Sequence, residues 1–180
     1  HCLPGADSEP SVIVESAEND AVECCLGAAI STGEEETFFI KAGENLPAKQ
    51  ILSMFTASEA ASYATLDLKP QLAALGLLER QVNGNIGLSN LFDGVLAAYL
   101  LNPLKNDYTY EDVAREQLGL MIDDKADEWT KSCYEAYTAY AASENLMEKL
   151  KEEQMDRLFL EIEMPLVFTL FDMEQAGVRI

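Results

Sequence analysis

The stretch LFDGVLAAYLLNP, from Leu91 to Pro103, decides the fold. It predicts a helix over Asn90–Leu101, because proline cannot continue a helix and Asn102-Pro103 therefore ends it. Asp93 lies at the start of this helix, where a carboxylate can accept hydrogen bonds from exposed backbone N–H groups. We favour that capping role for Asp93 over a role as a metal ligand.

The sequence before this helix is rich in strand signals. Three β-rich or apolar segments predict a strand meander, with a Thr32-Gly33 turn before the last of them: Ser11–Ser16, Glu23–Ile30 and Thr37–Lys41. Pro47 then begins a predicted helix that continues to Phe55, because proline suits the first turn of a helix. Ser62–Leu66 predicts one further short strand.

The sequence after Lys69 is mainly helical. A first helix carries leucines at intervals of three on one face: Leu72, Leu75 and Leu78. Tyr110–Leu118 predicts a second helix, which ends at Gly119 because glycine accepts the left-handed conformation of a C-cap.

Two long helices complete the predicted fold. Lys125–Lys151 carries a stripe that we expect to be buried: Ala126, Trp129, Cys133, Ala136, Tyr137 and Tyr140. Met155–Gln175 is expected to be kinked at Pro165 and to end at Gly177. Its expected buried face consists of Leu158, Ile162, Leu166, Leu170 and Met173.

A strand meander, a mixed sheet and flanking helices make one α/β domain the simplest architecture. No internal repeat, linker or low-complexity segment divides the chain. This order of elements suits a ribonuclease H-like fold. We interpret residues 1–8 as a tag remnant or disordered start and residues 9–180 as the folded domain.

The charge of the chain is strongly acidic. Among 180 residues, 32 are acidic and 12 are basic, so the formal net charge is −20. Such a surface repels a polyanion, because tight binding to nucleic acid depends on basic side chains that neutralise phosphates. Unaided binding of nucleic acid is therefore not expected.

The remaining composition limits the cellular compartment and the catalytic chemistry that we expect for the chain. The cysteines lack the CxxC spacing of a zinc site and are interpreted as reduced thiols: Cys2, Cys24, Cys25 and Cys133. No apolar run reaches the length of a membrane helix, and the first residues lack the pattern of a signal peptide. We expect a cytoplasmic monomer. His1 is the single histidine, so catalysis by histidine is excluded.

Two segments resemble family A DNA polymerases of bacteria. Leu91–Pro103 resembles the stretch in which an FD pair opens a helix with a YLL-type run. Glu161–Leu166, followed by Asp172–Ile180, resembles the E-x-E-x-P-L and M-E-x-x-G-V signature at the junction of the exonuclease and polymerase domains. The strand meander and the helix start at Asp67–Pro70 also fall in the family's order, so the resemblance covers the chain from about Glu9 onward.

The resemblance implies a 3′–5′ exonuclease-type domain of ribonuclease H-like fold that leads into a polymerase module. The chain ends at Val178-Arg179-Ile180, where family members continue, so we expect an excised domain without polymerase activity. The implied partner is the polymerase domain of the same parent chain. Magnesium would belong to that domain, and DNA would be contacted only through the parent enzyme.

The resemblance implies that the first two ligand positions of the exonuclease site lack carboxylates in this chain. A two-metal exonuclease needs several carboxylates around two ions, and a D-x-E motif on a strand aims both side chains at one site. The strand that resembles the family's first one reads VIVES, which places Val14 and Ser16 at the ligand positions and Glu15 on the opposite face.

The other two implied positions are also weakened. Alignment through Lys69 places the third carboxylate at Gln71, and an amide is a poor substitute. The fourth falls on Tyr134 or Glu135, so at most one carboxylate returns. One carboxylate cannot hold two ions, particularly magnesium, which loses its water reluctantly. We therefore predict no nuclease activity and no bound metal or cofactor in this segment.

Other acidic and aromatic residues are interpreted structurally. Asp172 and Glu174 lie about 200° apart on a helix and cannot converge on one ion. Two acidic pairs lie near the start of a long helix, where they favour its dipole: Asp123-Asp124 and Asp127-Glu128. Core packing is expected of three tyrosines rather than stacking on bases: Tyr134, Tyr137 and Tyr140.

The sequence thus predicts an inactive exonuclease-like domain that supports a DNA-directed DNA polymerase of replication and repair. One alternative is a protein-interaction module that recruits a basic partner through its acidic surface. Another is a metal-dependent exonuclease with relocated ligands.

Overall fold

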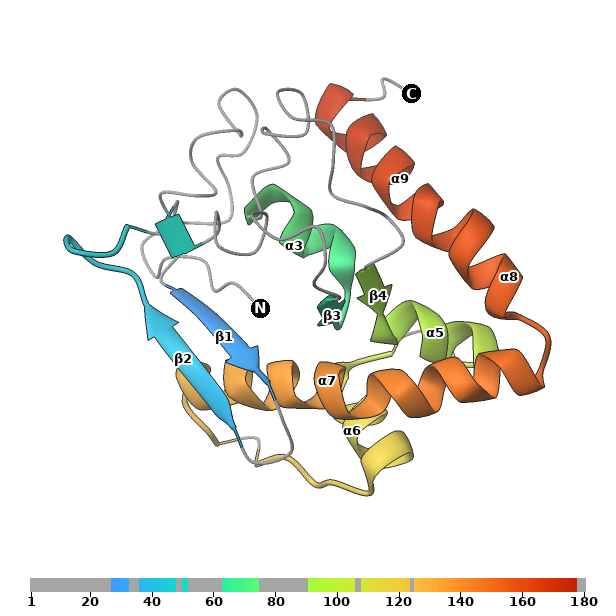
Figure 1. Ribbon diagram of the computed structural model, residues 1–180, viewed down its shortest axis with the longest axis horizontal. Helices are drawn as coiled ribbons and strands as arrows, with labels where there is room; N and C mark the ends of the chain where they lie inside the picture. Colours follow the sequence, from blue (N-terminus) through green and yellow to red (C-terminus); the bar gives the residue numbers. More distant parts are fainter. Residues whose placement is uncertain are drawn as a thin grey trace.

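The long helix α7 (Glu128–Glu152) is the element on which the other parts of the fold are assembled (Figure 1). In the computed structural model, the described residues are 27–32, 36–47, 50–51, 63–74, 91–105, 108–123 and 125–177. They form a mostly helical α/β domain with small sheets. The predicted strand Ser11–Ser16 lies outside these residues, as do Leu75, Leu78 and most of the helix predicted from Pro47.

Helix α7 begins and ends as its sequence dictates. The carboxylate of Asp127 accepts a hydrogen bond from the Thr130 backbone N–H at 3.0 Å and so caps the first turn. Lys149 and Lys151 lie in the last turn, where positive charge is favourable beside the helix dipole. The helix therefore begins three residues after the predicted Lys125, because Asp127 is its cap.

An antiparallel hairpin packs across the amino-terminal part of α7. Strands β1 (Gly27–Ser31) and β2 (Thr37–Lys41) pair so that Ala29 lies opposite Phe39. The Phe39 ring meets the Trp129 ring edge to face, with centroids 4.6 Å apart, and the Lys41 ammonium lies 5.6 Å from the Trp129 centroid. The strand predicted over residues 37–41 is confirmed. These aromatic contacts attach the hairpin to the helix.

A second, parallel pair of strands also packs against α7. Strand β3 (Tyr63–Thr65) pairs with β4 (Leu91–Asp93), and helix α3 (Leu68–Ala74) follows β3. Among the described residues, this pair and the hairpin form two separate sheets instead of the expected mixed sheet. The short strand predicted over Ser62–Leu66 is confirmed.

The segment Leu91–Pro103 contains a strand before its helix. Leu91, Phe92 and Asp93 pair with β3, and helix α5 (Gly94–Leu101) begins only after them. The prediction of a helix from Asn90 was therefore wrong at its start, because the pairing with β3 holds these residues extended. Asn102 ends the helix, as predicted.

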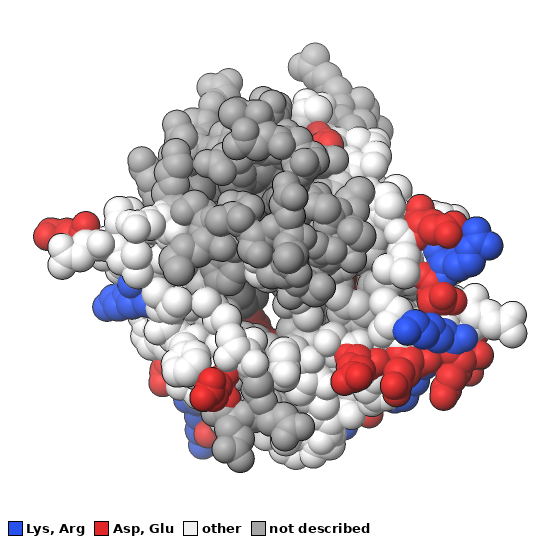
Figure 2. Space-filling model, viewed as in Figure 1, with Lys and Arg blue, Asp and Glu red and all other residues white. Residues whose placement is uncertain are grey.

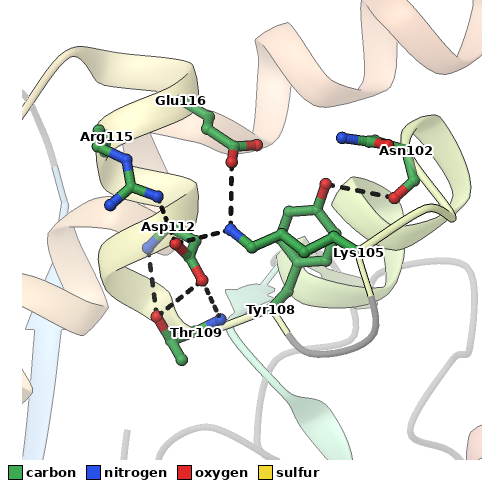
Figure 3. A network of polar contacts seen from close by, with 7 residues as sticks. All are labelled: Asn102, Lys105, Tyr108, Thr109, Asp112, Arg115 and Glu116. Carbon is green, nitrogen blue, oxygen red and sulfur yellow. Dashed lines mark hydrogen bonds and ion pairs between the residues drawn. The ribbon is translucent and has the colours of Figure 1, made fainter.

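Helix α6 (Tyr110–Leu118) has the predicted bounds. Thr109 and Asp112 form a reciprocal capping box at its start, and Gly119 adopts φ 67° at its end. Figure 3 shows how this start is held to the preceding loop: the Lys105 ammonium lies 2.6 Å from Asp112 and 3.2 Å from Glu116. Lysine and capping box together fix the turn between α5 and α6.

The buried face of α7 differs from the predicted stripe. The buried residues are Ser132, Thr138, Ala139, Ala142, Leu146 and Leu150, mostly small in the half that packs against β1. Tyr134 and Tyr140 are exposed and Tyr137 is half-buried, so the prediction that these tyrosines pack in the core was wrong. Small side chains occupy this face because strand β1 packs closely against the helix there.

The last helical segment also turns a different face inward. It consists of α8 (Asp156–Leu158), a π-helical turn (Phe159–Glu163) and α9 (Met164–Ala176), which rises along one side of the fold in Figure 1. Its buried residues are Phe159, Met164 and Phe168. The predicted inward face is exposed except for the half-buried Leu158: Ile162, Leu166, Leu170 and Met173.

The π-helical turn explains this correction. It adds one residue to a turn, so the buried positions step from Phe159 to Met164 by five instead of four. A prediction that continues a regular helical period through this turn therefore places the wrong side of the helix in the core. Pro165 is the second residue of α9 and follows the π-helical turn directly, and Gly177 ends the helix at φ 68° as predicted.

Candidate functional site

The carboxyl ends of the two parallel strands are the place to look for a site. In α/β folds, ligands bind in the crevice beyond these ends. Here the last residue of β4 is Asp93, which is only 4% exposed, and Asp67 follows β3 closely along the chain. The structure therefore brings two carboxylates from separate strands to one end of this sheet.

The carboxylate of Asp93 is fully engaged by backbone N–H groups. One oxygen, Oδ2, accepts a hydrogen bond from the Leu68 N–H at 2.7 Å. The other, Oδ1, accepts from Val95 and Leu96, both at 3.0 Å. Asp93 thus caps α5 and also binds the first residue of α3. The prediction that Asp93 caps a helix start is confirmed, and the bond to Leu68 extends it to a second helix.

Burial dominates the electrostatics of Asp93. Removal from water raises the pKa of its carboxyl group above the usual value, although the hydrogen bonds from Leu68, Leu96 and Val95 act in the opposite direction. The nearby Asp67 adds a smaller effect that also raises the pKa. Asp67 has φ 54°, a left-handed conformation that aspartate tolerates better than most residues.

Gly94 allows the tight passage from β4 into α5. A Cβ atom at this position would lie 2.7 Å from Leu66 Cδ2, closer than real carbon atoms approach, and 3.9 Å from Leu146 Cδ1. Hydrogen is therefore the only side chain that fits without movement of Leu66.

The predicted ligand positions are only partly described. Gln71 lies on α3, one turn after its start, and is 7% exposed. Glu135 lies half-buried on α7, next to the exposed Tyr134. Val14 and Ser16 lie outside the described residues. Within the described part of the chain, no three Asp, Glu, His or Cys side chains are grouped so that they could hold a metal ion.

Sequence reasoning found the cap but missed its second partner. The pairing of β4 with β3 places Asp93 beside the N–H of Leu68, which is 25 residues away in the chain. The available signal was an aspartate directly after an apolar segment that could form a parallel strand. Asp67 carried a similar signal, because it follows the predicted strand Ser62–Leu66.

The remaining acidic residues have local structural roles. The expectation that an aspartate stabilises the start of the long helix is confirmed for Asp127, whose carboxyl pKa is lowered by hydrogen bonds from Thr130. Glu174 forms an ion pair with Lys69 at 2.7 Å, which links α9 to α3. The Lys105 ammonium lowers the pKa of the Asp112 carboxyl group well below its usual range.

Comparisons with protein-family models, curated proteins and solved structures found no match for this chain. The described helices include none with the length and apolar character needed to cross a membrane.

Proposed function

We propose that this chain is an inactive 3′–5′ exonuclease-like domain of ribonuclease H-like fold, and that it supports the polymerase module of a bacterial family A DNA polymerase. Replication and repair synthesis would be carried out by that module, with its own magnesium ions. The 180-residue segment would be a scaffold without catalysis of its own.

The observation that carries this proposal is the state of Asp93. It is a buried carboxylate at the carboxyl end of a parallel strand pair, and both of its oxygens accept hydrogen bonds from backbone N–H groups of α3 and α5. A metal ligand in a two-metal nuclease must direct its oxygens at the ions. At Asp93 they are directed at two helix starts instead, which is a structural task.

The residues at the implied ligand positions support the same conclusion. Val14 is aliphatic, Ser16 and Gln71 are neutral, and Glu135 could supply only a single carboxylate. Two magnesium ions about 4 Å apart need several carboxylates, because each ion gives up water reluctantly. The formal charge of −20 further opposes binding of DNA by this segment alone.

The polymerase assignment depends on two stretches of sequence. Leu91–Pro103 contains β4 and α5. The second stretch is Glu161–Leu166 followed by Asp172–Ile180, and its described residues form the end of the π-helical turn and the two ends of α9. In these stretches the side chains of Leu91, Asp93, Ala97, Ala98 and Met164 are buried. The family membership remains our proposal.

Titration with Mn²⁺ by calorimetry, together with digestion of a 3′-labelled single-stranded primer, tests this function. We expect no saturable binding at micromolar concentration and no shortening of the primer. The matched variant restores the implied ligands through Val14→Asp, Ser16→Glu and Gln71→Asp, and should gain Mn²⁺ binding. Micromolar binding and primer cleavage by the unaltered chain would refute the proposal.

A further inference from the structure

We draw no further inference here: the strongest candidate, the acidic surface patch at the carboxyl-terminal end of α7 that includes the exposed Glu148, Glu152 and Glu153 (Figure 2), carries nothing, because nothing in the described part of the chain shows what would bind to it.

Discussion

Replacing Asp93 by alanine tests the double cap that closes the strand ends. The change removes the acceptor for the N–H groups of Leu68, Val95 and Leu96 at distances of 2.7–3.0 Å. Loss of a helix cap costs about 1 kcal/mol, and a buried N–H left without a partner costs about 1–3 kcal/mol. We therefore expect the free energy of unfolding to fall by about 2–4 kcal/mol, from a total of roughly 5–15 kcal/mol for a domain.

Urea denaturation followed by circular dichroism measures this loss. The control is Asp127→Ala, which removes a cap at an exposed helix start and should cost clearly less than Asp93→Ala. Asp93→Asn should give an intermediate loss, because the amide oxygen can still accept from α5 while its NH₂ group would face the Leu68 N–H. A loss at Asp93 no larger than at Asp127 would refute the double cap.

Three further predictions concern other contacts of the fold. Asp112→Asn should reduce stability most above about pH 4, because Lys105 holds the pKa of the folded Asp112 carboxyl group well below its usual range and its contribution is fully present above the ordinary value of 3.8. The loss should shrink gradually below pH 3.8 and vanish only as the pH falls through the depressed folded value. Urea melts at pH 7 and in steps below pH 4 measure this trend, and a loss that does not shrink with falling pH would contradict it. Gly94→Ala should cost about 1–3 kcal/mol by overpacking, measured by thermal melts, and an unchanged melting temperature would show that the core gives way easily. Phe168→Ala should cost about 3–5 kcal/mol while Leu170→Ala costs about 1 kcal/mol or less, and the reverse order in denaturation would mean that α9 turns its other side inward.

Local turn and cap chemistry was the part of the fold that the sequence predicted best. Residues 37–41 form a strand, α6 spans Tyr110–Leu118, and glycines end α6 and α9 where expected. In these places the deciding interactions lie within a few residues of each other in the chain. A capping carboxylate or a glycine with positive φ acts regardless of what packs nearby.

The inward faces of the long helices could not be predicted in the same way. The π-helical turn Phe159–Glu163 shifts the spacing of the buried residues along the helix, and we did not predict this turn from the sequence. On α7 we predicted a buried face from its aromatic side chains. The structure instead buries Ala139 and Ala142, because the rest of the fold approaches the helix closely. Tertiary packing decides which face of such a helix is buried, and the periodicity of the sequence alone does not predict that packing.

The candidate site was predictable in its residue types but not in its connections. Asp93 was correctly interpreted as a cap from its position near a helix start. Its bond to Leu68 depends on the parallel pairing of β3 with β4, which lies beyond local pattern. The expected loss of carboxylates at Val14 and Ser16 stays a prediction, because both residues lie outside the described part of the chain.

A crystal structure of the chain grown with Mn²⁺, read by anomalous scattering, tests the central claim most directly. The account predicts that Val14, Ser16, Gln71 and Glu135 surround no manganese and that the Asp93 carboxylate stays on the N–H groups of Leu68, Val95 and Leu96. A manganese ion held there by three or more carboxylate oxygens would contradict it.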